Sequence, residues 1–258
     1  MNTLRLPLAW LLWLALCATI WGAFFYAPPA EGFIGESSRI LFFHVPAAWA
    51  SFVMFFAAGI WSARYLFGSR QPRHDHAAQA AIELGLLLCI LAIVTGALWA
   101  RIMWGAYWNW DPRQVWITVA LLFYGAYLAL RSAVPDPETR RRLSSSYAVL
   151  GLIVAPFLFF VLPRMTGFSL HPEPVLNQQG KIEMNPRMLQ VLLLGSVGLT
   201  ALSFWIHNLR TRVLVLWEKR EERAYDELLA SGSQQSTGLN SEPTTAPTTT
   251  APTAGLET

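Results

Sequence analysis

The sequence predicts an all-α, polytopic membrane protein: a bundle of six transmembrane helices with both termini cytoplasmic. The first observation behind this prediction is composition, because 54% of the 258 residues are hydrophobic and only 14% are charged, against roughly 25% charged residues in soluble domains. The second is a set of six apolar runs, each close to the roughly 20 residues that a helix needs to cross a bilayer. The third is an uneven placement of Lys and Arg along the chain.

The six apolar runs define the predicted spans. These are Leu8–Tyr26, Ile40–Phe67, Gln79–Met103, Arg113–Leu130, Ser145–Leu162 and Arg187–Leu209. The first run has the alternative of a signal peptide cleaved near Ala27–Ala30, but it exceeds the roughly 7–15 apolar residues of such peptides, so a retained helix is expected. Helix-start signals support two of the boundaries, because Asp111-Pro112 and Asn185-Pro186 each place a capping side chain before a proline.

Charge placement predicts the orientation. The termini and the connections on their side of the membrane hold 13 of the 19 Lys and Arg residues, and the opposite connections hold 6. The positive-inside rule assigns the richer side to the cytoplasm. The net charge of +3 is therefore interpreted as a topology signal; the expected surrounding is the lipid bilayer, and no nucleic-acid partner is predicted.

Composition also divides the chain into three parts. Residues 1–215 hold all six predicted spans, and residues 216–230 are predicted to form a cytoplasmic helical stub. Residues 231–258 are rich in Ser, Thr, Pro, Gly and Gln, with too few apolar residues to form a core, so a disordered cytoplasmic tail is expected.

Tryptophan is concentrated in the connection between the third and fourth spans. Five of the twelve Trp residues lie within Trp99–Trp116, on the side opposite the termini. One interpretation is a belt of aromatic side chains at the membrane interface. The other is a platform for a flat, largely apolar ligand, and the residue pattern alone leaves both open.

Two of the five histidines are predicted on the same side as this aromatic connection. His44 lies near the start of the second span, and Arg64 follows 20 positions later, which puts His44 ~30 Å from the cytoplasmic boundary at the helical rise. His171 lies in the connection between the fifth and sixth spans, where Pro172 stiffens the backbone.

The other three histidines are expected on the cytoplasmic side. His74 and His76 fall between the second and third predicted spans in a basic segment, which is interpreted as a solvated loop. His207 is expected at the cytoplasmic end of the last helix, where a positive side chain complements the helix dipole.

Two motifs carry a resemblance to a known family. The run Trp104-Gly-Ala-Tyr-Trp108-Asn-Trp110-Asp111-Pro-Arg is similar to the tryptophan-rich WGxxWxWDP signature of haem-handling proteins of cytochrome c maturation. The run Phe43-His44-Val-Pro-Ala-Ala-Trp49 resembles the histidine motif of the haem exporter protein C (CcmC) family. The resemblance covers about residues 1–215, and six spans match this family better than its longer relatives CcmF and CcsA.

The resemblance implies a site for haem b, bound without covalent attachment. It implies His44 and His171 as axial ligands of the iron, above a shelf of aromatic side chains. The implied cofactor-binding residues beside these ligands are Trp104, Tyr107, Trp108, Trp110 and Asp111. Asp111 also has a local role as a helix cap, and it could orient a tryptophan or a docking partner. Because arginine pairs well with carboxylates, Arg39, Arg101 and Arg164 are the predicted propionate partners.

The function implied by the resemblance is haem binding at the periplasmic face of the bacterial cytoplasmic (inner) membrane and delivery to the haem chaperone CcmE. The implied assembly contains the ATPase CcmA, the membrane subunit CcmB and the small protein CcmD. The chain itself has no GxxxxGK[ST] phosphate loop and no GxSxG or HExxH motif, so ligand exchange is expected rather than classical catalysis.

Two alternatives remain open. A b-type haem electron carrier needs histidines within spans at both leaflets, and the predicted loop position of His74 and His76 disfavours it. A non-catalytic scaffold or permease subunit would use the tryptophan-rich connection only to dock partners. Cys17 and Cys89 form no CxxCH motif, so covalent haem attachment to this chain is not expected.

Overall fold

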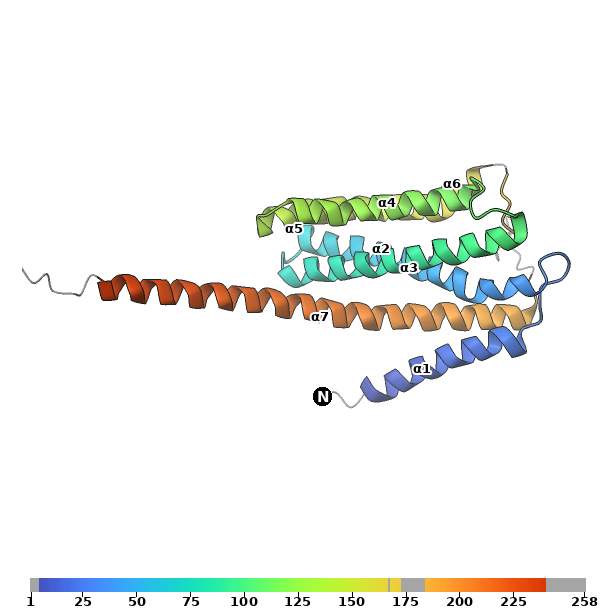
Figure 1. Ribbon diagram of the computed structural model, residues 1–258, viewed down its shortest axis with the longest axis horizontal. Helices are drawn as coiled ribbons and strands as arrows, with labels where there is room; N and C mark the ends of the chain where they lie inside the picture. The colour runs from blue at the N-terminus through green and yellow to red at the C-terminus, as the bar shows by residue number, and fades with distance from the viewer. Residues whose placement is uncertain (1–4, 167, 173–183, 240–258) are drawn as a thin grey trace, which may run out of the picture. The chain divides into compact units, whose positions relative to one another are not determined.

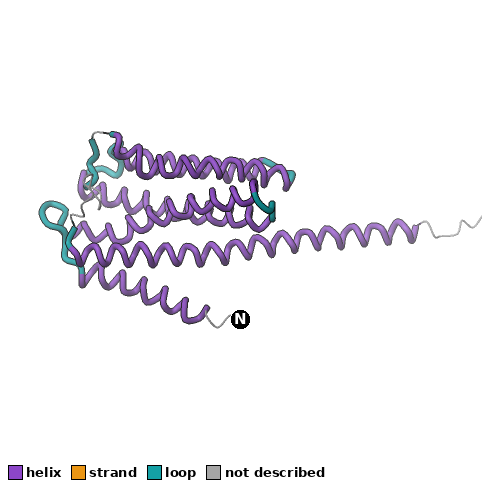
Figure 2. Tube along the Cα trace, turned by 180° about the vertical axis from the view of Figure 1, so that it is seen from behind, coloured by secondary structure: helices purple, strands orange, loops and turns teal. Residues whose placement is uncertain are grey.

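The computed structural model describes residues 5–166, 168–172 and 184–239, and every regular element in them is helical (Figure 1). Six stretches are long and apolar enough to cross a membrane, as predicted. The helices are α1 Arg5–Trp21, η1 Gly22–Tyr26, η2 Glu36–Ile40, α2 Leu41–Phe67, α3 Pro72–Trp104, α4 Pro112–Ala133, α5 Pro137–Pro156, η3 Phe157–Val161, α6 Leu162–Met165 and α7 Pro186–Leu239. Loops join them at both ends of the bundle (Figure 2).

The chain divides into two units, residues 1–215 and residues 216–258, and α7 contributes to both. The helical backbone of α7 continues to Leu239. It therefore extends into the segment 231–258 that composition predicted to be disordered, because adding residues to an existing helix costs far less than starting one. The rest of that segment, residues 240–258, lies outside the described residues.

The core of the first unit is built around a stacked pair of rings from α2 and α4. Phe55 and Tyr124 lie parallel, with ring centroids 3.7 Å apart. Glycines make this packing possible, because a Cβ on Gly85 of α3 would lie 2.7 Å from the Phe55 ring, and one on Gly151 of α5 would lie 2.7 Å from the Tyr124 hydroxyl. Small residues at helix contacts are typical of membrane bundles, where close packing replaces the hydrophobic effect between helices.

The first helix packs against the last span. A Cβ on Gly195 of α7 would lie 3.0 Å from Cγ2 of Thr19, and one on Gly198 would lie 3.6 Å from Cβ of Ala15. Large side chains on the outer face of α1 remain exposed, Trp13 among them. This distribution is what a helix with one face on protein and the other on lipid requires.

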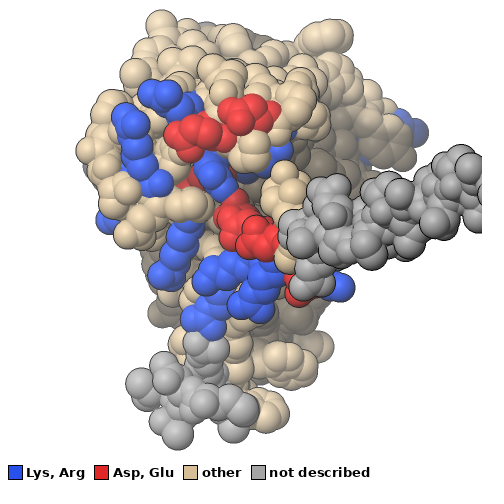
Figure 3. Space-filling model, turned by 90° about the vertical axis from the view of Figure 1, so that its left-hand side faces the viewer, with Lys and Arg blue, Asp and Glu red and all other residues tan. Residues whose placement is uncertain are grey.

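The segment that holds His74 and His76 is helical, so the prediction of a solvated loop was wrong. The third helix begins at Pro72 rather than at Gln79. Asp75 in its first turns is fully buried, with both carboxylate oxygens 2.7 and 2.9 Å from the guanidinium of Arg131 in α4. A charge-rich segment resembles a loop when the residue that neutralises its charge lies far away in the sequence. Other charged side chains gather at the same end (Figure 3).

His207 is also placed differently from the prediction. Because α7 continues beyond it, His207 does not lie at a helix end; it is buried, and its Nε2 lies 2.9 Å from the carbonyl oxygen of Ala77. The helical position of His74 removes the sequence-based objection to an electron carrier. Both rings instead have a structural contact, because each packs on the indole of Trp61. The ring-centroid distance is 5.6 Å for His74 and 6.4 Å for His207.

Candidate functional site

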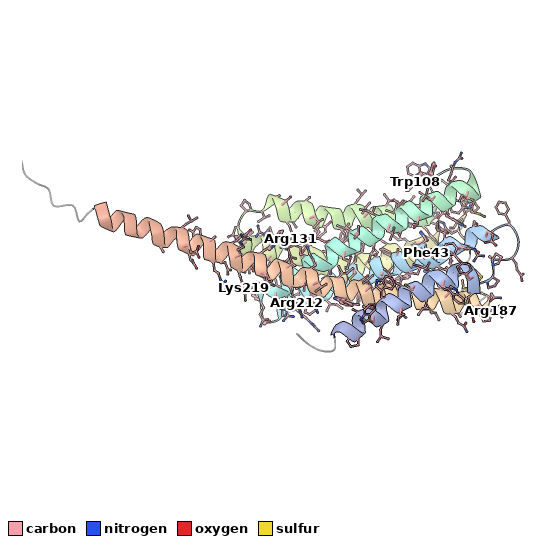
Figure 4. All side chains as sticks on the ribbon, turned by 60° about the horizontal axis from the view of Figure 1, so that its bottom comes forward. Phe43, Trp108, Arg131, Arg187, Arg212 and Lys219 are labelled. Atoms are coloured by element: carbon pink, nitrogen blue, oxygen red, sulfur yellow. The ribbon has the colours of Figure 1, made fainter. Side chains whose placement is uncertain are left out.

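The candidate site lies at the end of the first unit where α3 ends and α2 and α4 begin. Figure 4 shows Phe43, which precedes His44, toward the same end of the helices as Trp108, while Arg131 lies toward the other. The aromatic connection is bounded by two local signals. Gly105 adopts a φ of +78° and ends α3, and Asp111 caps α4 by accepting a hydrogen bond of 2.9 Å from the backbone N–H of Arg113.

The carboxylate of Asp111 also holds the loop that carries His171. Its Oδ2 accepts hydrogen bonds from the backbone N–H of Leu170 at 2.6 Å and from the hydroxyl of Ser169 at 2.9 Å. Its Oδ1 lies 2.7 Å from Nδ1 of His171. This approach departs from ideal hydrogen-bond alignment, but Nδ1 has no hydrogen-bond partner elsewhere among the described residues. One buried carboxylate therefore joins the start of α4 to the His171 loop.

The electrostatic environment keeps His171 neutral and Asp111 ionised. Burial lowers the pKa of His171 to about 4; Asp111 opposes this effect, and Arg113 and His44 add to it. Burial alone would raise the pKa of Asp111, but His171, the backbone N–H groups and the Ser169 hydroxyl outweigh burial and hold it below its usual value. At neutral pH, Nδ1–H of His171 therefore faces a carboxylate, and Nε2 keeps its lone pair.

His44 lies in the first turns of α2 and faces α3. Its Nδ1 is 3.1 Å from the hydroxyl oxygen of Thr95. The next residue, Gly96, lies against the same ring, since a Cβ there would be 2.8 Å from Cε1 of His44. His44 is also near enough to His171 to influence its pKa. The fold thus brings the two predicted ligands close enough to interact electrostatically.

Two indoles lie beside the imidazole of His171. The ring centroid of Trp104 is 5.0 Å away at an interplanar angle of 71°, and that of Trp99 is 6.0 Å away. The two indoles contact each other edge to face at 5.0 Å. Trp104 was predicted as a site residue and Trp99 was not. The only sequence signal for Trp99 was its place in the tryptophan-rich run.

The other aromatic residues of the predicted shelf are more exposed. The rings of Trp108 and Trp110 contact each other at 5.6 Å, edge to face, and the side chain of Tyr107 is also exposed. Trp110 is 78% exposed and has a φ of +54°, in the left-handed region. That conformation costs about 1–3 kcal/mol for a residue other than glycine and is often found at functional sites. Packing within the described chain does not account for this indole.

All three predicted propionate partners donate to backbone carbonyl groups in their own surroundings. Arg39 donates to the carbonyl oxygens of Ala23 and Ala27 and pairs with Glu36. It therefore satisfies carbonyl groups at the end of the first span. Arg101 donates to the carbonyl oxygen of Gly105, and its guanidinium lies over the ring of Tyr107.

Arg164 and Arg113 are two further cations near this end. Arg164, the third predicted partner, donates to the carbonyl oxygen of Phe160 at 2.8 Å, within its own helical segment. Arg113 was not among the predicted site residues. It donates to the carbonyl oxygen of Pro172 at 3.2 Å and influences the pKa of His171. It therefore helps Asp111 to hold the His171 loop, a role that the sequence did not indicate.

Comparison with known proteins gives a consistent result. The family model described as Heme exporter protein C matches residues 1–226. The chain is 32% identical over 214 residues to Heme exporter protein C of Bradyrhizobium diazoefficiens, covering 80% of each protein. It is 32% identical over 219 residues to Heme exporter protein C of Rhodobacter capsulatus, covering 80% of this chain and 86% of the relative.

A plant relative extends the comparison. A putative cytochrome c biosynthesis ccmC-like mitochondrial protein of Marchantia polymorpha is 29% identical over 211 residues, covering 81% of this chain and 86% of the relative. The region that the family model matches includes both sequence motifs, five membrane-length helices in full and the sixth up to residue 226. The chain therefore belongs to the haem exporter protein C (CcmC) family, and its role lies in haem handling for cytochrome c maturation.

Proposed function

We propose that this protein binds haem b non-covalently between His44 and His171 and delivers it to the periplasmic haem chaperone CcmE. The observation that carries the proposal is the pairing of His171 with the buried carboxylate of Asp111, at 2.7 Å, while His44 lies in the same electrostatic neighbourhood. In this proposal haem is the cargo of the protein and not a permanent cofactor.

The donor set fits this cargo. Haem iron accepts two neutral imidazoles, and a ligating histidine usually donates its second ring N–H to a carboxylate or another oxygen. His171 has this arrangement with Asp111, and His44 has a hydroxyl at the corresponding position. The indoles of Trp99 and Trp104 supply apolar aromatic surface next to His171, as a porphyrin ring requires.

The exposed aromatic residues and the arginines complete the proposed site. Tyr107, Trp108 and Trp110 would extend the aromatic surface toward the aqueous side, where a chaperone can reach the haem. Arg101 and Arg164 each donate to a backbone carbonyl near them in sequence, and a haem propionate could replace that acceptor. Arg39 would have to release Glu36 to do the same.

Release of the haem would depend on the loop that carries His171. This loop is tied to the start of α4 through Asp111 and Arg113, so loosening those contacts withdraws one ligand while His44 stays on a long helix. Exchange for a ligand of the chaperone then needs no hydrolytic chemistry from this chain. Energy coupling is assigned to CcmA, with CcmB and CcmD as further membrane partners.

The proposed location is the bacterial inner membrane, with both termini cytoplasmic and the haem site periplasmic. The excess of Lys and Arg on the side of the termini supports this orientation. Residues 231–258 are proposed to lie on the cytoplasmic side. Fusion of a reporter that is active only in the periplasm, at the aromatic connection and at the C-terminus, tests this; activity at the C-terminus would contradict it.

The ligand assignment is tested by absorption spectroscopy of the full chain in detergent with haem supplied. His44→Ala and His171→Ala should each change the Soret and α/β bands, because each removes one axial imidazole. His74→Ala, at the other end of the bundle, is the matched control and should leave the spectrum unchanged. If both ligand variants keep the wild-type bands, the assignment is wrong.

Delivery needs a separate experiment. The haem-loaded protein is mixed with apo-CcmE, and haem bound to each protein is followed after separation. We expect haem to be transferred from the wild-type protein to the chaperone. The chaperone should take up free haem from detergent alone at a lower rate. Equal transfer from both sources would contradict a delivery role.

A further inference from the structure

The side chain of His44 is bordered by two consecutive residues of α3, Thr95 and Gly96. The hydroxyl oxygen of Thr95 lies 3.1 Å from Nδ1 of His44. A Cβ at Gly96 would lie 2.8 Å from Cε1 and 3.4 Å from Nδ1 of the same ring. Thr95 therefore meets the imidazole at Nδ1, and Gly96 meets it at Cε1, the carbon between the two nitrogens, where a Cβ would also lie 3.7 Å from Nε2.

The hydrogen bonds of Thr95 determine which nitrogen of His44 carries the proton. The hydroxyl has one hydrogen, and its acceptors are the backbone carbonyl oxygens one turn earlier, Leu91 at 2.7 Å and Ala92 at 3.2 Å. Toward His44 the hydroxyl can then only accept, so Nδ1 must be the protonated nitrogen of a neutral imidazole. The lone pair consequently lies on Nε2.

Gly96 determines where the ring can lie. A separation of 2.8 Å between two carbons is well inside the optimal 3.5–4.0 Å for such a pair, so any side chain at position 96 would push the imidazole away. Because α2 and α3 pack against each other along their length, they cannot separate to make room. The imidazole of His44 would therefore have to adopt another rotamer. The absence of a side chain at this position is thus part of the geometry of His44.

We propose that Thr95 and Gly96 are positioning residues for His44. Thr95 selects the tautomer that presents Nε2, and Gly96 keeps the ring in the place where Thr95 can bind it. This inference rests on the proposed function, in which His44 is an axial ligand. It assigns to the His44 side the role that Asp111 has for His171, with a neutral hydroxyl in place of a carboxylate.

The first test measures haem affinity in the full-length protein in detergent. Thr95→Val keeps the branched shape but removes the acceptor, and Thr95→Ser keeps the hydroxyl. We expect Thr95→Val and Gly96→Ala to weaken haem binding roughly 10–100-fold, the usual effect of losing an outer contact of a metal-bound histidine. Thr95→Ser should bind nearly as the wild type does.

Two matched controls separate positioning from general damage to the helices. Thr200→Val removes a hydroxyl that makes the same bond to the carbonyl one turn earlier, at 2.6 Å. Gly125→Ala adds a Cβ in a membrane helix at a position with nothing within 4 Å. Both controls should keep wild-type affinity; a loss in the controls equal to that in Thr95→Val and Gly96→Ala would overturn the positioning role.

The second test does not depend on haem. Nitrogen-15 NMR of the ring of His44 in the haem-free protein reports which nitrogen carries the proton. The wild type should show the proton on Nδ1, and Thr95→Val should show a mixture of the two tautomers. A wild-type proton on Nε2 would overturn the inference whatever the haem affinity is.

The outcomes also distinguish this inference from the proposed function. If His44→Ala leaves the haem spectrum and affinity unchanged, the ligand assignment fails and the positioning role fails with it. If His44→Ala disrupts ligation while Thr95→Val and Gly96→Ala bind as the wild type does, only the positioning role fails. In a His44→Ala background, Thr95→Val should cause no further loss, because the two changes act through one ring.

Discussion

Nδ1 of His171 lies 2.7 Å from Oδ1 of Asp111, the residue that also caps α4. One carboxylate thus fixes a helix start and orients an imidazole 60 positions later in the chain. Any displacement of α4 at its first turn is therefore transmitted to the loop that carries His171. The cap and the ligand position cannot be altered independently at Asp111.

The first prediction concerns Asp111→Asn. Asparagine still caps helices well, so the fold should persist, but the amide lacks the charge that holds Nδ1–H of His171. We expect haem affinity to fall roughly 10–100-fold, as measured by titration of the Soret band. Asp136→Asn is the matched control, because Asp136 caps α5 in the same way, accepting from the backbone N–H of Thr139 at 2.7 Å. Equal effects of the two variants would argue against a role in ligand orientation.

The second prediction concerns pH and the stability of the haem-free protein. The pKa of His171 is about 4 in the folded chain, against 6.5 in the unfolded chain, chiefly because burial disfavours its charged form. The unfolded chain therefore binds more protons between these two values. The stability that this group contributes is fully present above pH 6.5 and is lost as the pH falls toward 4.

This pH effect can be isolated by comparison with His171→Gln. Thermal unfolding in detergent should show the wild-type Tm falling more steeply than that of the variant between pH 6.5 and 4. Asp111 adds to the loss only at lower pH, because its own pKa is lowered below 3.8. Parallel Tm curves for the two proteins across this window would contradict the assigned environment of His171.

The third prediction concerns the backbone of Trp110. Glycine adopts a φ of +54° without the steric cost that a side chain incurs, and little buried area is lost from an indole that is 78% exposed. Trp110→Gly should therefore raise the free energy of unfolding by up to about 1 kcal/mol while weakening haem binding. Trp110→Ala should weaken haem binding equally without the gain in stability. If Trp110→Gly destabilises the fold, the indole has a structural role instead.

The fourth prediction concerns the buried ion pair at the opposite end of the bundle. Arg131→Met leaves Asp75 buried without its cation and should cost about 3–5 kcal/mol of stability. Adding Asp75→Asn should recover much of that loss, as followed by thermal unfolding in detergent. Arg210→Met is the comparison, since its pair with Glu83 is about one-third exposed and should cost about 1 kcal/mol or less. A larger loss in Arg210→Met would reverse this ranking.

Local sequence signals predicted the limits of most elements at the site. Six apolar runs of membrane length, the Asp111-Pro112 start of α4 and the Asn185-Pro186 start of α7 all have their predicted form, with the Asn185 side chain accepting from the backbone N–H of Arg187. The two sequence motifs predicted the family. Each of these signals is read within one helix or one turn, where the interacting groups are neighbours in the chain.

The errors share the opposite property. The segment of His74 and His76 resembled a solvated loop because Arg131, which neutralises Asp75, lies 56 positions away. Thr95 and Gly96 carried no distinguishing signal, and Trp99 had only its place in the tryptophan-rich run, because their importance comes from contacts with histidines of other segments. The same holds for Arg113, whose link to Pro172 spans 59 positions.

The sequence by itself determined that this chain crosses a membrane with six helices and that it carries the histidine and tryptophan motifs of one family. Hydropathy, helix length and capping are local quantities, so no fold was needed to evaluate them. Only the tertiary structure decided which side chains orient the two histidines, namely Asp111 for His171 and Thr95 for His44. Those contacts exist because helix packing brings residues that are distant in the sequence within hydrogen-bonding range. The hydrophobic periodicity of one helix carries no information about how that helix is aligned against its neighbours.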